Sequence, residues 1–179
     1  TDITGCDNTG KALDYPTSVT VSPDGTSVYV ASGSSDAVVV FERATDGTLT
    51  QKAGTAGCIV DEDETAITGC TNTGKALDGA YSVTVSPDGN SVYVVSYNSD
   101  AVAVFDRATD GTLTQKAGTA GCIVNEPATD IAGCDNTGKA LDGARLVTVS
   151  PDGTSAYVTS YNSDAVAVFD RATDGTLTQ

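Results

Sequence analysis

A tandem repeat with a period of 64 constrains this chain more than any other feature of its sequence. Cysteines mark the period, because Cys6, Cys70 and Cys134 follow one another at this same regular spacing. The repeat divides the sequence into three units, at residues 1–64, 65–128 and 129–179. The second and third units differ at 8 of their 51 shared positions. Such a period is typical of propellers and solenoids, in which each unit buries its apolar surface against its neighbours.

The most regular part of each unit has the pattern of four short β-strands. In the second unit, the alternating or apolar runs that predict them are residues 82–86, 92–95, 101–105 and 113–117. Turn signals separate these runs, with Pro87-Asp88-Gly89 after the first and Asp110-Gly111 before the last. No segment has sustained helical periodicity. The sequence therefore predicts an all-β protein made of four-stranded antiparallel units in tandem.

The third strand of each unit is almost entirely apolar, as expected when both faces of a sheet are covered. A four-stranded unit cannot bury two apolar faces alone, whereas units stacked face to face around an axis bury both. We therefore expect β-propeller blades. A flat β-solenoid is the alternative, although the coils of solenoids are usually much shorter than this repeat.

A motif in each unit resembles a known group of proteins. The string Ser-Pro-Asp-Gly-x-x-x-Tyr-Val is followed by Ser-Asp-Ala-Val-x-Val-Phe and then by Asp-Gly-Thr-Leu-Thr, and it begins at Ser22, Ser86 and Ser150. It is similar to the blades of lactonase-type propellers, a group that includes the 6-phosphogluconolactonase-like proteins and the YVTN repeats of microbial surface proteins. The motif consists of turn and core residues, so the resemblance implies a blade and says little about function. The cysteine-bearing link at residues 118–144 departs from this pattern.

The sequence does not determine how the ring of blades is completed. Propellers have roughly 4–8 blades, and the third unit lacks a counterpart of residues 116–128, so it is expected to be truncated in its last strand. We expect further repeats of the same polypeptide, or other copies of the chain, to complete an incomplete ring.

The charge of the chain excludes some partners. Asp and Glu outnumber Lys and Arg by 24 to 9, which gives a net charge of −15 at pH 7. Such a surface repels nucleic acid and anionic lipid, which carry the same sign. No apolar run approaches the roughly 20 residues that span a bilayer. We therefore expect neither nucleic-acid binding nor membrane insertion.

Five cysteines in an acidic, repetitive chain indicate an oxidising compartment, and we expect an extracellular or cell-surface protein. Two pairing schemes fit the period. The first joins Cys58 to Cys70 and Cys122 to Cys134, and leaves Cys6 unpaired within the chain. The second joins Cys6 to Cys58 and Cys70 to Cys122, and leaves Cys134 unpaired. We favour the first because its short separations close at a low entropic cost.

Polar residues gather where a propeller would bring its loops together. The loops between the second and third strands carry Asp36, Asp100 and Asp164, and the blade-to-blade links share the same face. Residues 61–64 add an acidic run that only the first unit has. These oxygens suggest a calcium site with Asp36, Asp100 and Asp164 as candidate ligands. The alternative is that Asp, Asn, Ser and Gly serve here as turn formers. No other cofactor is expected.

Candidate catalytic groups are scarce. The sequence has no His, so a Ser–His or Cys–His dyad is excluded, and near-identical blades present the same groups repeatedly. We therefore expect no catalytic set. Tyr15, Tyr81 and Arg145 differ between units where the links meet the first strands, and they are candidate recognition residues.

Three functions are consistent with these patterns. The favoured one is an extracellular or cell-surface propeller that acts as a structural and multivalent binding module. The second is a fibre- or envelope-forming unit that associates with copies of itself. The third is a lactonase-like hydrolase.

Overall fold

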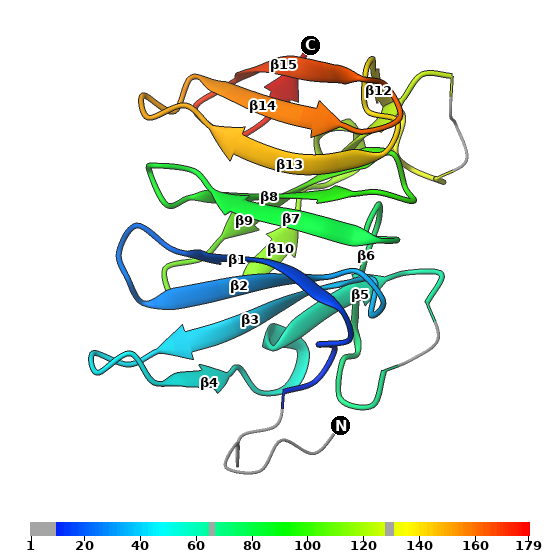
Figure 1. Cartoon of the computed structure of the whole chain (residues 1–179). Coiled ribbons are helices and arrows are strands. Elements are labelled where there is room, and N and C mark those ends of the chain that lie inside the picture. The colour runs from blue at the N-terminus through cyan, green and yellow to red at the C-terminus, as the bar shows by residue number, and fades with distance from the viewer. Residues whose placement is uncertain (1–9, 65–66, 128–130) are drawn as a thin grey trace.

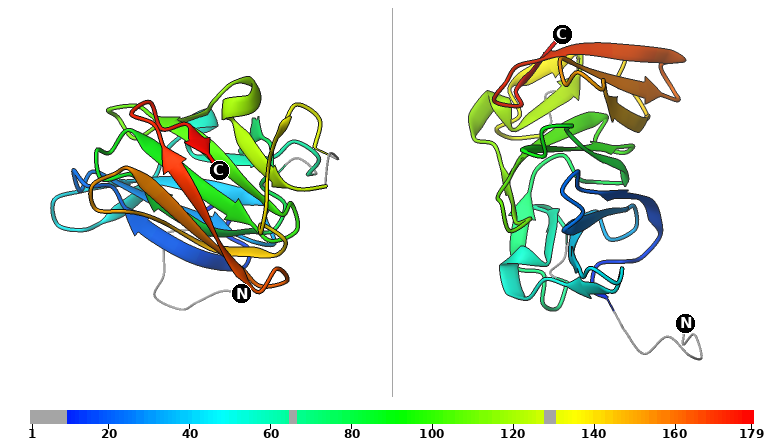
Figure 2. Two further views of the ribbon diagram at one scale, coloured as in Figure 1. Left: turned by 90° about the horizontal axis from the view of Figure 1, so that it is seen from above. Right: turned by 90° about the vertical axis from the view of Figure 1, so that its left-hand side faces the viewer.

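Three β-sheets lie one above another in a single stack (Figure 1). The computed structural model describes residues 10–64, 67–127 and 131–179. The first sheet is at the bottom of the view, the second in the middle and the third at the top, and the right-hand view of Figure 2 shows the same order. No α-helix occurs among the described residues. The all-β fold and the tandem arrangement of blades are confirmed.

Each sheet begins with an antiparallel meander of three strands. The first sheet contains β1 (Pro16–Val21), β2 (Ser27–Ser32), β3 (Ala37–Arg43), β4 (Leu49–Gln51), β5 (Cys58–Asp61) and β6 (Asn72–Gly74). The second contains β7 (Ala80–Val85), β8 (Ser91–Ser96), β9 (Ala101–Arg107), β10 (Leu113–Gln115), β11 (Cys122–Asn125) and β12 (Asn136–Gly138). The third contains β13 (Ala144–Val149), β14 (Ser155–Ser160), β15 (Ala165–Arg171) and β16 (Leu177–Thr178).

The fourth strand position is divided between two short strands. In the second sheet, β10 pairs with the end of β9, and β11 pairs with its beginning. A 3-10 turn at Gly118–Ala120 joins the two short strands, and Gly54–Ala56 does the same in the first sheet. The expected strand at 113–117 therefore ends earlier, at Gln115. The chain turns away after Gln115 and returns to the same strand edge, because β9 is long enough to pair with two segments.

The cysteine-bearing link adds two strands to the sheet of its blade. Its strand β11 extends the second sheet, and β12 pairs with β11 in parallel. The disulfide between Cys122 and Cys134 holds the segments that lead into these two strands together, with a Cα–Cα distance of 5.4 Å. The same arrangement recurs between Cys58 and Cys70. Because β6 pairs with β5, the first sheet includes residues from the second sequence unit.

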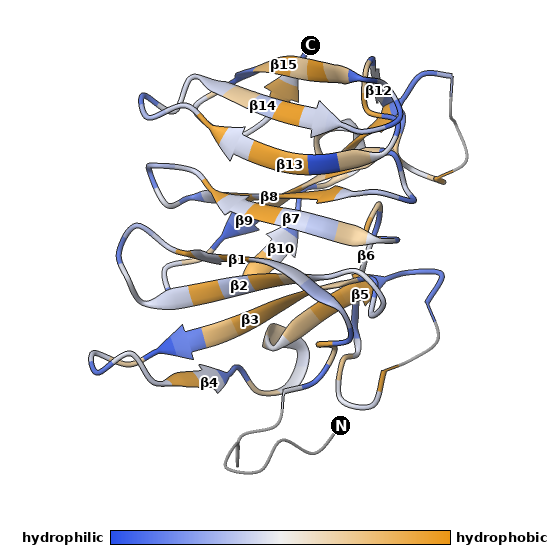
Figure 3. Ribbon diagram, viewed as in Figure 1, coloured by the Kyte–Doolittle hydropathy of each residue, from blue (hydrophilic) through white to orange (hydrophobic). Residues whose placement is uncertain are grey.

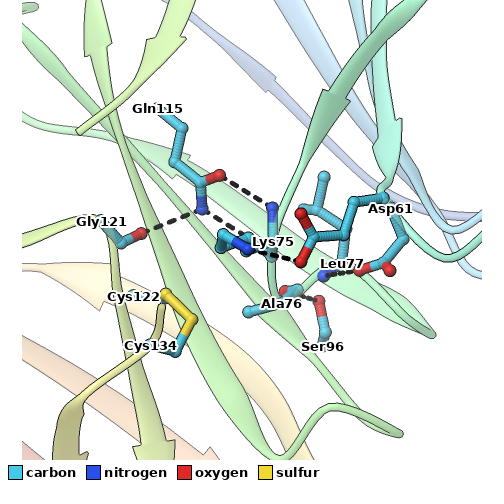
Figure 4. Close-up of a disulfide and its surroundings, with 10 residues drawn as sticks. Asp61, Lys75, Ala76, Leu77, Ser96, Gln115, Gly121, Cys122 and Cys134 are labelled. Atoms are coloured by element: carbon cyan, nitrogen blue, oxygen red, sulfur yellow. Dashed lines mark hydrogen bonds and ion pairs between the residues drawn. A yellow bond between two sulfur atoms is a disulfide. The ribbon is translucent and has the colours of Figure 1, made fainter. Parts of the chain in front are cut away.

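Polar side chains attach each link to its surroundings (Figure 4). The Gln115 side chain accepts a hydrogen bond from the Lys75 backbone amide at 2.8 Å and donates to the carbonyl oxygens of Lys75 and Gly121. The carboxylate of Asp61 accepts from the Leu77 amide at 2.7 Å. These contacts satisfy backbone groups that lie outside the regular ladders, so the links keep a defined path beside the next sheet.

Apolar side chains fill the spaces between sheets. One cluster, which includes Tyr29, Val40 and Phe105, lies between the first and second sheets. A second cluster, which includes Tyr93 and Phe169, lies between the second and third sheets. The middle sheet is therefore covered on both faces, as its nearly continuous apolar strands predict.

Candidate functional site

A small pocket opens on the face where the first strands begin. It has a volume of about 230 Å³ and is lined by Tyr15, Gly33, Ser34, Gly79, Tyr81, Tyr97, Asn98 and Arg145. We call it the tyrosine–arginine pocket. Its residues come from all three sheets, because β1, β7 and β13 lie side by side across the two sheet boundaries. The pocket therefore exists only when the three blades are stacked.

Arg145 lies among three aromatic rings. Its guanidinium carbon is 4.3 Å from the ring centroid of Tyr161, 5.2 Å from that of Tyr97 and 5.4 Å from that of Tyr81. Each distance is within the range of a cation–π contact. The Nε atom of Arg145 is buried and has no hydrogen-bond partner among the described residues. The rings hold the guanidinium in place and leave part of its donor capacity unused.

The first unit has its tyrosine just before the first strand, whereas the other two units have theirs just after the second strand. Tyr15 stands where the later units have Gly79 and Gly143, whereas Gly33 stands where they have Tyr97 and Tyr161. Tyr15 has a φ of 55°, a conformation that glycine adopts freely and a bulky residue rarely does. A Cβ atom at Gly33 would lie 3.3 Å from the Tyr15 ring. Each blade thus has a tyrosine at one of these two paired positions, and in the first blade it is kept despite backbone strain.

The three candidate recognition residues from the sequence, Tyr15, Tyr81 and Arg145, meet in this one pocket. Sequence reasoning missed Tyr97, which lies in the loop after β8, and Tyr161, which contacts Arg145. The exchange of tyrosine and glycine between paired positions in different units is visible in the sequence and is the signal that identifies them.

An acidic pocket adjoins the first one and shares Asn98 with it. Its volume is about 420 Å³, and its carboxylates belong to Asp36, Asp61, Glu62, Asp63, Glu64, Asp78 and Asp100. The acidic run of the first link and the loops after β2 and β8 therefore share a face, as expected. Burial, with added effects from Asp78 and Glu64, raises the pKa of Asp36 to about 6.

Two of the three calcium candidates already have a structural role. Asp36 accepts a hydrogen bond from the Gly79 amide at 2.7 Å, and Asp100 accepts one from the Gly143 amide at 2.6 Å. Each carboxylate therefore ties its loop to the following sheet. Asp164, the third member of the series, is exposed. Among residues 10–64, 67–127 and 131–179, no group of three or more acidic or cysteine side chains has an arrangement that could hold a metal ion. Calcium binding stays a prediction.

The cysteines follow the first pairing scheme, with Cys58 bonded to Cys70 and Cys122 to Cys134. Cys6 lies outside the described residues. Two disulfides indicate an oxidising, non-cytoplasmic compartment. Within the described part of the chain, no helix has the length and apolarity needed to cross a membrane.

Solved structures share this arrangement of blades. A protein from Bacteroides fragilis, assigned as a 6-phosphogluconolactonase, matches 91% of this chain with a TM-score of 0.65 and 23% identity. A similar protein from Bacteroides uniformis matches 91% with a TM-score of 0.62 and 21% identity. The periplasmic gluconolactonase of Pseudomonas aeruginosa matches 92% with a TM-score of 0.58 and 24% identity. This chain has the fold of the lactonase-type β-propellers.

The likeness is one of fold. The chain spans 37%, 39% and 41% of the length of those three solved chains, respectively, which agrees with an incomplete propeller. No protein-family model matches the sequence, and no curated protein matches it. The resemblance seen in the blade motif is thus confirmed as a propeller fold.

Proposed function

We propose that this chain is an extracellular or cell-surface propeller module that combines a structural role with ligand binding at the tyrosine–arginine pocket. The observation that carries the proposal is Arg145, held among three tyrosine rings with a buried Nε that has no partner in the described part of the chain. Ligand sites usually combine apolar and aromatic walls with a few placed polar groups. The strained Tyr15 supports the same site, since backbone strain is often retained where a residue is needed for binding.

A saccharide fits the chemistry of this pocket best. The flat C–H face of a sugar ring packs against tyrosine rings, and the hydroxyl groups accept hydrogen bonds from Arg145 and Asn98. A strongly anionic ligand is disfavoured because the net charge is −15 and the acidic pocket adjoins the site. Further blades with a tyrosine at the same rim would repeat the contact and give multivalent binding.

The test is a binding titration of the full chain against a panel of neutral hexoses, N-acetylhexosamines and their disaccharides. Tyrosine fluorescence reports occupancy, because the chain has no Trp and three of its seven Tyr line the pocket. We expect Arg145→Ala and Tyr97→Ala to weaken binding by about tenfold or more, which corresponds to about 1.4 kcal/mol. Lys139→Ala removes an exposed positive charge elsewhere and is the control. Absence of binding across the panel, or equal affinity in all variants, would contradict the proposal.

A lactonase-like hydrolase is the second candidate, favoured by the fold and by Asp36. A carboxyl group with a pKa of about 6 can exchange protons near neutral pH, as a general acid or base must. Turnover of six-carbon sugar lactones is the assay, with Asp36→Asn as the variant. Turnover that Asp36→Asn removes would support this candidate, whereas none above the spontaneous rate would rule it out.

A further inference from the structure

Adjacent sheets are joined by the same polar contact at both boundaries. Between the first and second sheets, the Arg107 Nε donates to the Tyr29 hydroxyl at 2.7 Å, and its Nη2 donates to Asp24 at 2.8 Å. The Tyr29 hydroxyl in turn donates to the carbonyl oxygen of Gly111 at 2.8 Å. We call this set the arginine clamp. The side chain of Arg107 is only 5% exposed, so its charge depends on these partners.

The second boundary repeats the clamp one period later. Arg171 donates to the Tyr93 hydroxyl at 2.7 Å and to Asp88 at 2.9 Å, and Tyr93 donates to the Gly175 carbonyl at 2.8 Å. Burial raises the pKa of Tyr93, so its hydroxyl stays protonated and can donate. In both cases the tyrosine and the aspartate belong to one sheet, and the arginine and the glycine belong to the next.

The two outer sheets carry the unmatched halves of a third clamp. In the first sheet, Arg43 is the counterpart of Arg107, and the only hydrogen bond of its side chain among the described residues goes to Gly25 of its own sheet at 3.2 Å. In the third sheet, Asp152 is exposed, and Tyr157 is 39% exposed although its counterparts Tyr29 and Tyr93 are 0% exposed. The donor half lies at one end of the stack and the acceptor half at the other.

The apolar surfaces are divided in the same way. On the first sheet, Val19 is 67% and Leu49 is 38% exposed, whereas their second-sheet counterparts Val83 and Leu113 are 4% and 3% exposed. On the third sheet, Val166 and Val168 are 58% and 52% exposed, whereas the equivalent valines of the other sheets are buried. Figure 3 shows hydrophobic residues on β14 and β15 at the top of the stack, with no described sheet beyond them.

We propose that the outer face of the third sheet binds the outer face of the first sheet of a second copy of this chain, head to tail. Arg43 of the second copy donates to Asp152 and Tyr157, and the Tyr157 hydroxyl donates to the Gly47 carbonyl of that copy. Val166 and Val168 pack against Val19 and Leu49. Shape and charge are complementary because each face has a close counterpart within the chain, already paired. Contacts of this type close into a ring or continue as a filament. The docking is independent of any ligand in the tyrosine–arginine pocket.

The measurement is the mass of the full chain in solution by light scattering after size exclusion, in a Cys6→Ser background that excludes a bridge through this thiol. We expect twice the 18.0 kDa of one chain if two copies close a ring, or larger masses that grow with concentration if a filament forms. A single-chain mass up to concentrations of about 1 mM, where weak contacts between proteins become populated, would overturn the proposal.

Charge reversal tests the orientation of the contact. Arg43→Asp places two acidic groups at the joint, and Asp152→Arg places two basic groups there, so each variant alone is expected to associate at least about tenfold more weakly. Mixing the two variants restores an opposite-charge pair at every joint between unlike copies and should restore association. Asp135→Arg makes the same charge change at an exposed position in the link at residues 118–144 and is the control. Variants that associate like the wild type, or a mixture that stays monomeric, would refute head-to-tail docking.

Discussion

The second and third sheets have nearly the same sequence but occupy different surroundings. Tyr93 and Val102 of the second sheet are 0% exposed, whereas Tyr157 and Val166 at the same repeat positions are 39% and 58% exposed. The residues are identical, so the difference comes from the neighbouring sheet alone. The contribution of a side chain to stability is therefore set by whether a next blade covers it, as in other repeat proteins.

The strongest test of this comparison is a substitution of the leucine that begins the short fourth strand. Leu113 is 3% exposed and packs in the core between the first two sheets, whereas Leu49 is 38% exposed at the same repeat position. We expect Leu113→Ala to lower the free energy of unfolding by about 3 kcal/mol, since it leaves a cavity. We expect Leu49→Ala to cost less than about 1 kcal/mol. Urea denaturation of dilute protein measures both, and equal losses would contradict the comparison.

The clamp arginines form a second matched pair. Arg107→Ala removes the donor that Asp24 and the buried Tyr29 hydroxyl share, and we expect a loss of about 2 kcal/mol because these acceptors lose their partner. Arg43→Ala removes a side chain bonded only within its own sheet in the described part of the chain, and we expect a loss below about 0.5 kcal/mol in dilute protein. Urea denaturation again measures both. A loss at Arg43 as large as that at Arg107 would show that contacts within one sheet, not between sheets, determine the effect.

Tyr15 allows the first blade, which has a bulky residue at this positive φ, to be compared with the other two, which have glycine there. Tyr15→Gly installs the residue that the other units have at this positive φ, and we expect it to raise the melting temperature and to stabilise the fold by about 1 kcal/mol. The same change removes a wall of the tyrosine–arginine pocket, so saccharide binding should weaken. Gly79→Ala is the reverse control: it replaces glycine with a residue that has a side chain at this positive φ, and it should destabilise the fold. A destabilised Tyr15→Gly protein would mean that the ring contributes more by packing than its backbone costs.

The smallest expected effect concerns pH. The folded-state pKa of Asp36, about 6, lies above its ordinary value of 3.8, so the folded protein binds this proton more tightly than the unfolded chain does. Stability therefore falls as pH rises from about 4 to about 6 and stays lower above that range. Asp36→Asn keeps an acceptor for the Gly79 amide and removes the charge, so we expect a gain of at most about 1 kcal/mol near pH 7, after allowing for solvent screening, and almost none near pH 4.

Two results would decide this last prediction. Asp164→Asn is the control, since no sheet in the described part of the chain covers Asp164, and its unfolding curves at the two pH values should match those of the wild type. A gain in Asp36→Asn that is equal at both pH values would show that the ionisation of Asp36 is not its cause.

Much of the fold could be predicted from local patterns. The alternation of Val and Thr, the Pro-Asp-Gly turns and the close spacing of Cys58 and Cys70 are short-range features, and local geometry gives them a narrow range of structures. The arginine clamp was missed because its partners are far apart in the chain and meet only across a sheet boundary. The parallel pairing of β5 with β6 was missed for a similar reason, since neither segment is a convincing strand by itself.

The sequence by itself determined the repeat, the strands, their turns and an acidic, disulfide-bonded chain. Only the tertiary structure decided which copies of each residue are buried, how the fourth strand is divided, and that Tyr15, Tyr81 and Arg145 share a pocket with Tyr97. The physical reason is that propensity and turn chemistry act between residues close in the chain, whereas burial and cross-sheet hydrogen bonds depend on which surfaces are stacked. Nearly identical sequences therefore formed an interior in one blade and an open face in another.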